Sequence, residues 1–117
     1  MPTVIGTLFV VSGSPEKKMR AFFAVDPVLG TLTQYLTRKD YENRRIRNSK
    51  VYNLNEVMTV GGPINKNDMN CLEMTFFDEK VLLLALPSTI LINRWITYLH
   101  SSKKLSGWLQ SINLMLK

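Results

Sequence analysis

The most constraining feature of this chain is one helix-periodic stretch near the C-terminus, which follows a long series of short strand-like runs. Residues 4–86 consist of runs rich in β-branched and aromatic residues, with turn-forming residues between them. A set of strands closed by a single amphipathic helix leaves few possible architectures. The helical face in residues 88–99 comprises Leu91, Ile92, Trp95, Ile96 and Leu99.

Seven strands are expected, at residues 4–11, 17–25, 31–37, 51–54, 57–60, 71–77 and 81–86. The short turns between them, rich in Gly, Pro and Asp, predict antiparallel pairing. Segment 38–50 contains few apolar residues and is expected to be an exposed loop, and the Gly-Gly-Pro sequence in segment 61–68 predicts another loop. Pro87 should end the last strand, and Ser88 or Thr89 should cap the helix.

A second apolar stripe follows the helix. Residues 101–104, Ser-Ser-Lys-Lys, interrupt the first helical face, and the new stripe comprises Leu105, Trp108, Leu109, Ile112 and Leu116. We therefore expect one domain over residues 1–117, with a core at 4–100 and a helical extension at 101–117. The stripe of the extension is expected to pack on the domain, and contact with a partner or a second copy is the alternative.

The composition is that of a globular domain, and the charge is concentrated in the first half of the chain. Apolar residues make up 45% and charged residues 21% of the 117 residues. The net charge is +6; residues 1–50 hold nine Lys and Arg against four Asp and Glu, whereas residues 51–117 hold six against five. Such a local positive field suits a polyanion, either an anionic lipid or nucleic acid. A merely solubilising surface is the plainer explanation.

The sequence contains no obvious targeting or anchoring signal. No apolar run is long enough to cross a bilayer, and the first residues, Met-Pro-Thr-Val, form neither a signal peptide nor a myristoylation site. The single cysteine, Cys71, cannot form an internal disulfide, which is typical of a reducing compartment. Unless the chain is a fragment whose anchor lies elsewhere, we expect a cytoplasmic protein that contacts membranes only peripherally, on their cytosolic face.

Several motifs along roughly residues 4–99 occur in a recurrent order. They are Gly6-Thr-Leu8 in the first strand, a basic-x-basic pair before an aromatic second strand at 18–25, short strands at 32–35 and 50–54, and Trp95 in the terminal helix. In this order and spacing the chain resembles a pleckstrin homology (PH) domain. The resemblance implies a mainly β fold with a C-terminal helix: a seven-stranded antiparallel, partly open barrel or sandwich, capped by that helix.

In PH domains that bind phosphoinositides, basic residues of the first two strands and of the region between strands three and four surround the phosphates. Phosphate oxygens accept several charge-assisted hydrogen bonds, so donors must be arranged around a cup. The residues that this resemblance places at the headgroup are Lys17, Lys18, Arg20, Tyr35, Arg38, Lys39 and Lys50.

The run Arg44-Arg45-Ile46-Arg47 permits several explanations. A short basic run in a loop is commonly just a solvated surface. It also suits electrostatic attraction to a membrane or docking of an acidic protein. Ile46, in the middle of the run, is an apolar side chain that would suit shallow insertion among acyl chains.

One position departs from the lipid-binding pattern of the family. The signature begins with a lysine near the end of the first strand, where this chain has Val10, beside a short loop that carries Glu16. The departure argues against stereospecific recognition of one phosphoinositide. Weaker, charge-driven binding survives, because each basic side chain near an anionic leaflet contributes on the order of 1 kcal/mol. A small headgroup such as phosphatidic acid would suit a shallow cup.

The sequence offers little for catalysis. One histidine and one cysteine cannot supply a metal cluster, and no glycine-rich phosphate loop precedes a helix. We expect no catalytic residues, cofactor, metal or small-molecule substrate. The leading prediction is a phospholipid-binding membrane-recruitment module, and a PH-like protein-interaction module with little lipid binding is the alternative. Nucleic acid ranks last, because only Tyr35 and Tyr41 lie near the basic residues.

Overall fold

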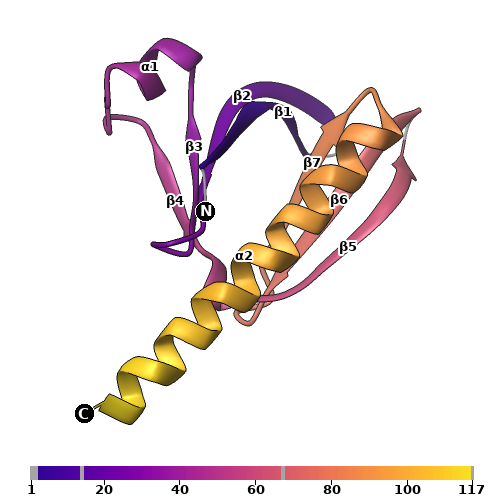
Figure 1. Cartoon of the computed structure of the whole chain (residues 1–117). Coiled ribbons are helices and arrows are strands. Elements are labelled where there is room, and N and C mark those ends of the chain that lie inside the picture. The colour runs from indigo at the N-terminus through magenta and orange to yellow at the C-terminus, as the bar shows by residue number, and fades with distance from the viewer. Residues whose placement is uncertain (1–2, 14, 67, 117) are drawn as a thin grey trace.

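The computed structural model describes residues 3–13, 15–66 and 68–116, with side chains up to residue 103 (Figure 1). The described chain forms two α-helices, α1 (Arg38–Glu42) and α2 (Thr89–Leu116), and one 3-10 turn, η1 (Leu54–Glu56). Its strands are β1 (Val4–Ser12), β2 (Lys17–Asp26), β3 (Thr31–Tyr35), β4 (Lys50–Asn53), β5 (Val57–Lys66), β6 (Met69–Phe76) and β7 (Val81–Leu86).

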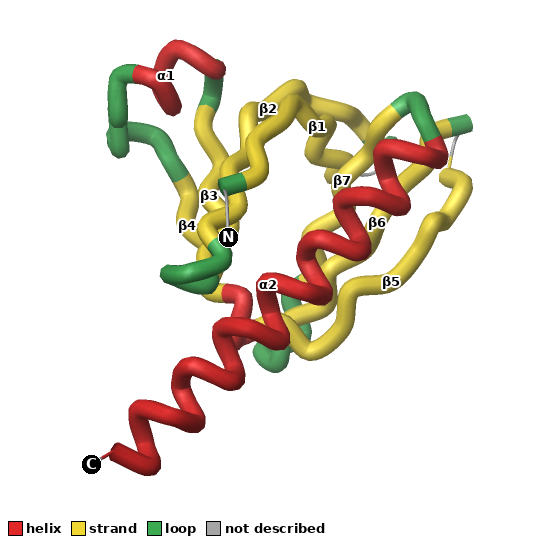
Figure 2. The backbone as a smooth tube through the Cα atoms, viewed as in Figure 1, coloured by secondary structure: helices red, strands yellow, loops and turns green. Residues whose placement is uncertain are grey.

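All seven strands belong to one antiparallel sheet, in the order β4-β3-β2-β1-β7-β6-β5. The sheet curls into a half-barrel, and α2 crosses its concave side (Figure 2). The helix contacts β2, β5, β6, β7 and η1. The predicted mainly β architecture, a partly open antiparallel barrel with a C-terminal helix, is therefore confirmed.

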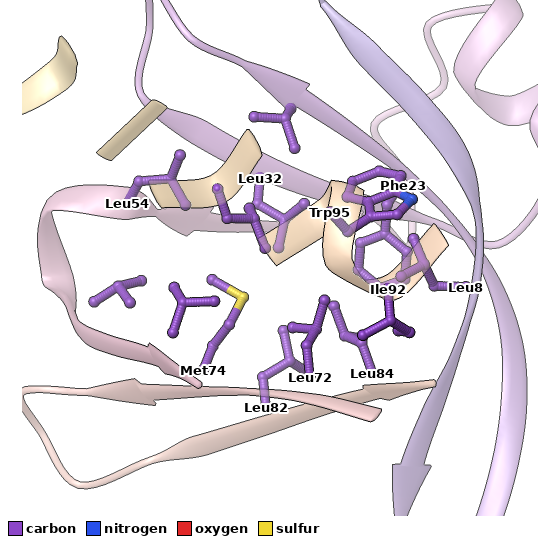
Figure 3. Close-up of a cluster of buried hydrophobic side chains, with 14 of the residues drawn as sticks. Leu8, Phe23, Leu32, Leu54, Leu72, Met74, Leu82, Leu84, Ile92 and Trp95 are labelled. Carbon is purple, nitrogen blue, oxygen red and sulfur yellow. The ribbon is translucent and has the colours of Figure 1, made fainter. Parts of the chain in front are cut away.

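The core fills the space between the inner face of the sheet and α2 (Figure 3). Successive side chains of a strand point to opposite faces, so alternate residues reach this core. The predicted inward set of β6, Leu72, Met74 and Phe76, is buried. The largest fully buried side chains include Leu8, Phe23, Leu32, Leu54, Leu72, Met74, Leu84, Ile92 and Leu99.

Trp95 of α2 packs directly on the first strand at Gly6. A Cβ atom at Gly6 would lie 2.9 Å from Cζ2 of the indole, so a side chain larger than hydrogen would push the helix away. Gly6 and Trp95 are two of the positions that carry the PH resemblance, and they share one contact. Trp95 is 8% exposed, so it is a core residue, as the sequence predicted.

Helix α2 begins after Ser88, whose Oγ accepts a hydrogen bond from the Leu91 amide at 3.4 Å. The helix continues through residues 101–104 to Leu116, so the predicted extension is helical. Ser102 is buried and follows Leu99 at the spacing of the buried face, so a small polar residue continues this face. Leu91, expected on that face, is 41% exposed.

The distal half of α2 runs past the sheet (Figure 1). The predicted second stripe belongs to this half, but the side chains that form it lie outside the described ones: Leu105, Trp108, Leu109, Ile112 and Leu116. Its packing therefore stays a prediction.

Two predicted loops contain regular structure. Segment 38–50 begins with α1, because Thr37 caps it by accepting from the Asp40 amide at 3.2 Å. Segment 61–68 is largely strand, since β5 continues to Lys66 through a register shift between Gly61 and Ile64. β5 is an edge strand, where a proline and a bulge are tolerated.

Candidate functional site

The register of the β1–β2 hairpin sets which way its basic side chains point. Lys18 pairs with Val11 and Arg20 pairs with Phe9. Their neighbours Leu8 and Ala21, one position along, belong to the core. Lys18 and Arg20 therefore lie on the opposite, outer face of the sheet.

Both cations pack over one aromatic ring on this outer face. The Lys18 Nζ lies 5.2 Å from the centroid of the Phe9 ring, and the Arg20 Cζ lies 5.9 Å from the same centroid. Both side chains are exposed. Among the described residues, neither has a carboxylate within ion-pair distance. The ring holds the two cations without neutralising them.

Helix α1 brings a third cation to the same face. Tyr41 packs against Phe22 of β2 at 5.3 Å and against Tyr35 of β3 at 5.6 Å, centroid to centroid, which fixes α1 on the sheet. The Arg38 Cζ consequently lies 5.9 Å from the Phe22 ring centroid. Arg20 and Arg38 then line one cavity of about 250 Å³. We call Lys18, Arg20 and Arg38 the outer cationic patch.

The other predicted headgroup residues lie around or away from this patch. Lys17 is exposed at the start of β2, and Lys39 is exposed on α1. Tyr35 is half-buried beneath Tyr41. Lys50 pairs with Gln34 on the inner side of the sheet and lines a separate cavity of about 640 Å³, with Lys80 and Asp78 at the open mouth of the barrel. The structure thus brings Arg20 and Arg38 together and places Lys50 elsewhere.

Two carboxylates of α1 offset part of the local positive charge. Glu42 accepts from the Arg38 Nε at 3.0 Å, and Asp40 lies 3.8 Å from the Arg45 guanidinium. Both arginines stay largely exposed in these pairs, so the pairs contribute little to stability. Arg44 and Arg47 have no carboxylate within ion-pair distance among the described residues.

The sequence motifs did not predict that two aromatic rings, Phe9 and Phe22, lie beneath the cations of this site. Phe22 follows Arg20 by two residues, so strand alternation alone puts it on the face of the cations, whereas only the β1–β2 register shows that Phe9 shares that face. A signal for α1 was present, since Thr37 is followed three residues later by Asp40, the spacing of a helix N-terminus.

The described residues offer few other sites. They contain no group of three or more His, Cys, Asp or Glu side chains placed to hold a metal ion. No described helix combines the length and apolar character needed to span a bilayer. Cys71 is fully buried, and burial raises the pKa of its thiol, with a smaller upward contribution from Glu16 and an opposing one from Lys66.

The fold is that of a known class of domain. The solution structure of the PH domain of human oxysterol binding protein-related protein 11 is similar to this chain, with a TM-score of 0.70 and 12% sequence identity. The match covers 89% of this chain and 82% of that one. No protein-family model and no curated protein matches the sequence. The chain has the pleckstrin homology fold, as its sequence motifs predicted.

Proposed function

We propose that this chain is a phospholipid-binding module that recruits attached protein segments to the cytosolic face of a membrane. Its ligands would be anionic headgroups, either a phosphoinositide or phosphatidic acid. The observation that carries the proposal is the outer cationic patch, in which three cations from two separate segments share one exposed face. Lys18 and Arg20 have no carboxylate partner among the described residues, so their charge is open to an external anion.

The strength of such binding follows from the number of cations. Each basic side chain near an anionic leaflet contributes about 1 kcal/mol, so Lys18 and Arg20 together give roughly a thirtyfold gain in affinity. Arg38 adds less than a further fivefold, because Glu42 offsets part of its charge. Lys17, Lys39, Arg44 and Arg47 are also exposed and add to the field around the patch. The field decays within about 10 Å at moderate salt, so binding should weaken as salt rises.

Val10 supports broad rather than stereospecific recognition. It stands where the lipid-binding signature has a lysine, and its side chain packs against the core on the inner face. A donor at that position is therefore lacking, while the outer cationic patch on the other face is untouched. We expect similar binding to vesicles of equal surface charge, whether they contain phosphatidic acid or a phosphoinositide.

Vesicle sedimentation tests the proposal directly. The chain should pellet with vesicles that contain phosphatidic acid or a phosphoinositide, and stay in solution with neutral phosphatidylcholine vesicles. Raising the salt should release it. Lys18→Ala combined with Arg20→Ala should weaken binding roughly thirtyfold.

A matched double variant controls for total charge. Lys80→Ala with Arg94→Ala removes two exposed cations from the β6–β7 turn and from α2, away from the patch. It should bind nearly as the parent does. Equal losses in both doubles would show that only net charge matters, and no binding to any anionic vesicle would reject the proposal.

A protein-interaction module is the second candidate, and one groove favours it. The start of β1 and the first half of α2 enclose a mostly apolar cavity of about 720 Å³, lined by Ile5, Ile90 and Leu91 among others. Such a groove suits an apolar peptide face. Nucleic acid is less suited, because Phe22 under Arg38 is only 4% exposed and cannot stack on a base.

A further inference from the structure

The turn between α1 and β4 holds an exposed isoleucine in a fixed position. Ile46 is 82% exposed. Its carbonyl oxygen accepts hydrogen bonds from the Ser49 amide at 3.1 Å and the Ser49 hydroxyl at 2.7 Å. Arg44 and Asn48 adopt left-handed backbone angles, with φ of 53° and 66°, so the chain turns sharply on both sides of Ile46. The side chain is presented outward by an ordered turn.

Two more exposed apolar side chains lie close to Ile46. Ile46 and Leu36 line one cavity of about 590 Å³, and Ile46 and Leu29 line another of about 540 Å³. Leu36 is 51% and Leu29 71% exposed. Leu29 is held in its turn because its amide donates to the Asp26 carboxylate at 3.0 Å. We call Leu29, Leu36 and Ile46 the apolar rim.

Basic side chains surround this rim. Arg44, Arg45 and Arg47 line the first cavity with Ile46. The carboxylates that line these two cavities are already engaged, Asp40 by Arg45, Glu42 by Arg38 and Asp26 by backbone amides. The result is an apolar tip encircled by cations, which matches the layered chemistry of a membrane surface: hydrocarbon below and anionic headgroups above. An acidic protein surface would match the arginines but would leave Ile46 facing polar groups.

We infer that Ile46 inserts among the acyl chains of an anionic membrane, with Leu29 and Leu36 at the depth of the headgroups. Arg44, Arg45 and Arg47 then lie in the phosphate layer, since long basic side chains extend toward the interface while their stems stay in apolar surroundings. Arg38 and Tyr41 of α1 connect the rim to the outer cationic patch. This inference rests on the proposed lipid binding and adds how the domain is oriented on the membrane.

Affinity for vesicles gives the first test. Ile46→Ala should weaken binding to phosphatidic acid vesicles about fivefold to tenfold, since part of the apolar area buried on insertion is lost. Val81→Ala is the matched control, because Val81 is 56% exposed at the open mouth of the barrel, away from the rim. It should bind as the parent does. Both variants should melt close to the parent, because the altered side chains are exposed.

A depth-sensitive probe gives the second test. Ile46→Cys and Val81→Cys are labelled with the environment-sensitive fluorophore NBD; Cys71 is fully buried, so the unmodified parent should take up little label. On phosphatidic acid vesicles, NBD at residue 46 should shift to the blue and be quenched by lipids brominated on the acyl chain. NBD at residue 81 should do neither.

The outcomes separate this inference from the proposed function. If the parent pellets, yet Ile46→Ala binds equally well and NBD at residue 46 stays in a watery environment, insertion is rejected and headgroup binding stands. If the parent fails to pellet with every anionic vesicle, both fall. A blue shift that appears without quenching by acyl-chain bromine places Ile46 at the headgroups and also rejects insertion.

Discussion

Lysine side chains on the two halves of the outer surface have different neighbours. On the side of β2 and α1, Lys18 lies over the Phe9 ring without a carboxylate partner among the described residues. On the side of β6 and β7, Val11, Cys71 and Ala85 form a small buried apolar cluster, against which the partly buried Phe9, Met69 and Leu83 pack. There Lys66 of β5 meets Glu16 of the β1–β2 turn, 3.3 Å from Nζ to Oε1.

This difference shows how the neighbours of a lysine determine what it can do. Lys66 joins the end of β5 to the first hairpin, and Glu16 offsets part of its charge within the protein. Lys18 lies over the Phe9 ring, whose quadrupole attracts a cation but cannot neutralise its charge. The first arrangement contributes to the fold, and the second keeps its charge for a ligand. Arg20→Glu and Glu16→Gln each convert one arrangement toward the other, and the titration of Cys71 measures how well the Lys66 side is shielded from water.

Arg20→Glu should have the largest effect, because it replaces an unpaired cation of the outer cationic patch with a second carboxylate beside Glu42. Arg20 and Arg38 line one cavity, so a glutamate at position 20 would remove one cation and pair with a second. Affinity for phosphatidic acid vesicles should fall about thirtyfold, against about fivefold for Arg20→Ala. Sedimentation at low salt measures both values.

Lys80→Glu makes the same charge change on the β6–β7 turn and serves as its control. A loss of no more than a few-fold is expected there. If Lys80→Glu and Arg20→Glu weaken binding equally, the patch has no special part in binding. The unfolding free energy of Arg20→Glu should match that of the parent within about 1 kcal/mol, because the new pair is exposed.

The pH dependence of stability tests how well the protein shields the Cys71 thiol from water. Burial raises the pKa of the thiol above its ordinary value of 9.0, so the folded state holds its proton longer than the unfolded state does. Stability is therefore unaffected below that value and falls as the pH rises through it, by at most about 1.4 kcal/mol per pH unit. Urea unfolding at pH 7.5 and 9.5 should show this loss in the parent and a smaller one in Cys71→Ala. Equal losses in both would mean that the thiol is not shielded.

Much of the fold could be predicted from the sequence because its strongest patterns concern burial. The period-two run of β6 and the spacing of Ile92, Trp95 and Leu99 on α2 reflect the core directly. The secondary structure of segments 38–50 and 61–68 was harder to predict from the sequence. In α1 a cap and an aromatic contact stabilise five residues with little apolar character, and in β5 a bulge at a sheet edge accommodates Gly-Gly-Pro. These are tertiary effects that local composition does not carry.

The candidate site was predictable in its residue types and less so in its geometry. The basic-x-basic spacing put Lys18 and Arg20 on one face, as strand alternation requires. The place of Lys50 depends on the pairing of β4 with β3, which the sequence does not reveal, and that pairing turns it inward. The Glu16–Lys66 contact joins residues fifty positions apart and had no local signal.

Glu16→Gln should have the smallest effect and is the converse of Arg20→Glu. It opens the Lys66 pair, which is about half exposed on the lysine side, so the unfolding free energy should fall by less than about 1 kcal/mol. It also removes a negative charge from the turn just before Lys17 and Lys18 of β2, so affinity for anionic vesicles should rise about twofold to fivefold. Glu79→Gln, an equal charge change on the β6–β7 turn, should leave affinity nearly unchanged. A fall in affinity on Glu16→Gln would instead make Glu16 part of the binding surface, and the contrast between the two faces would no longer hold.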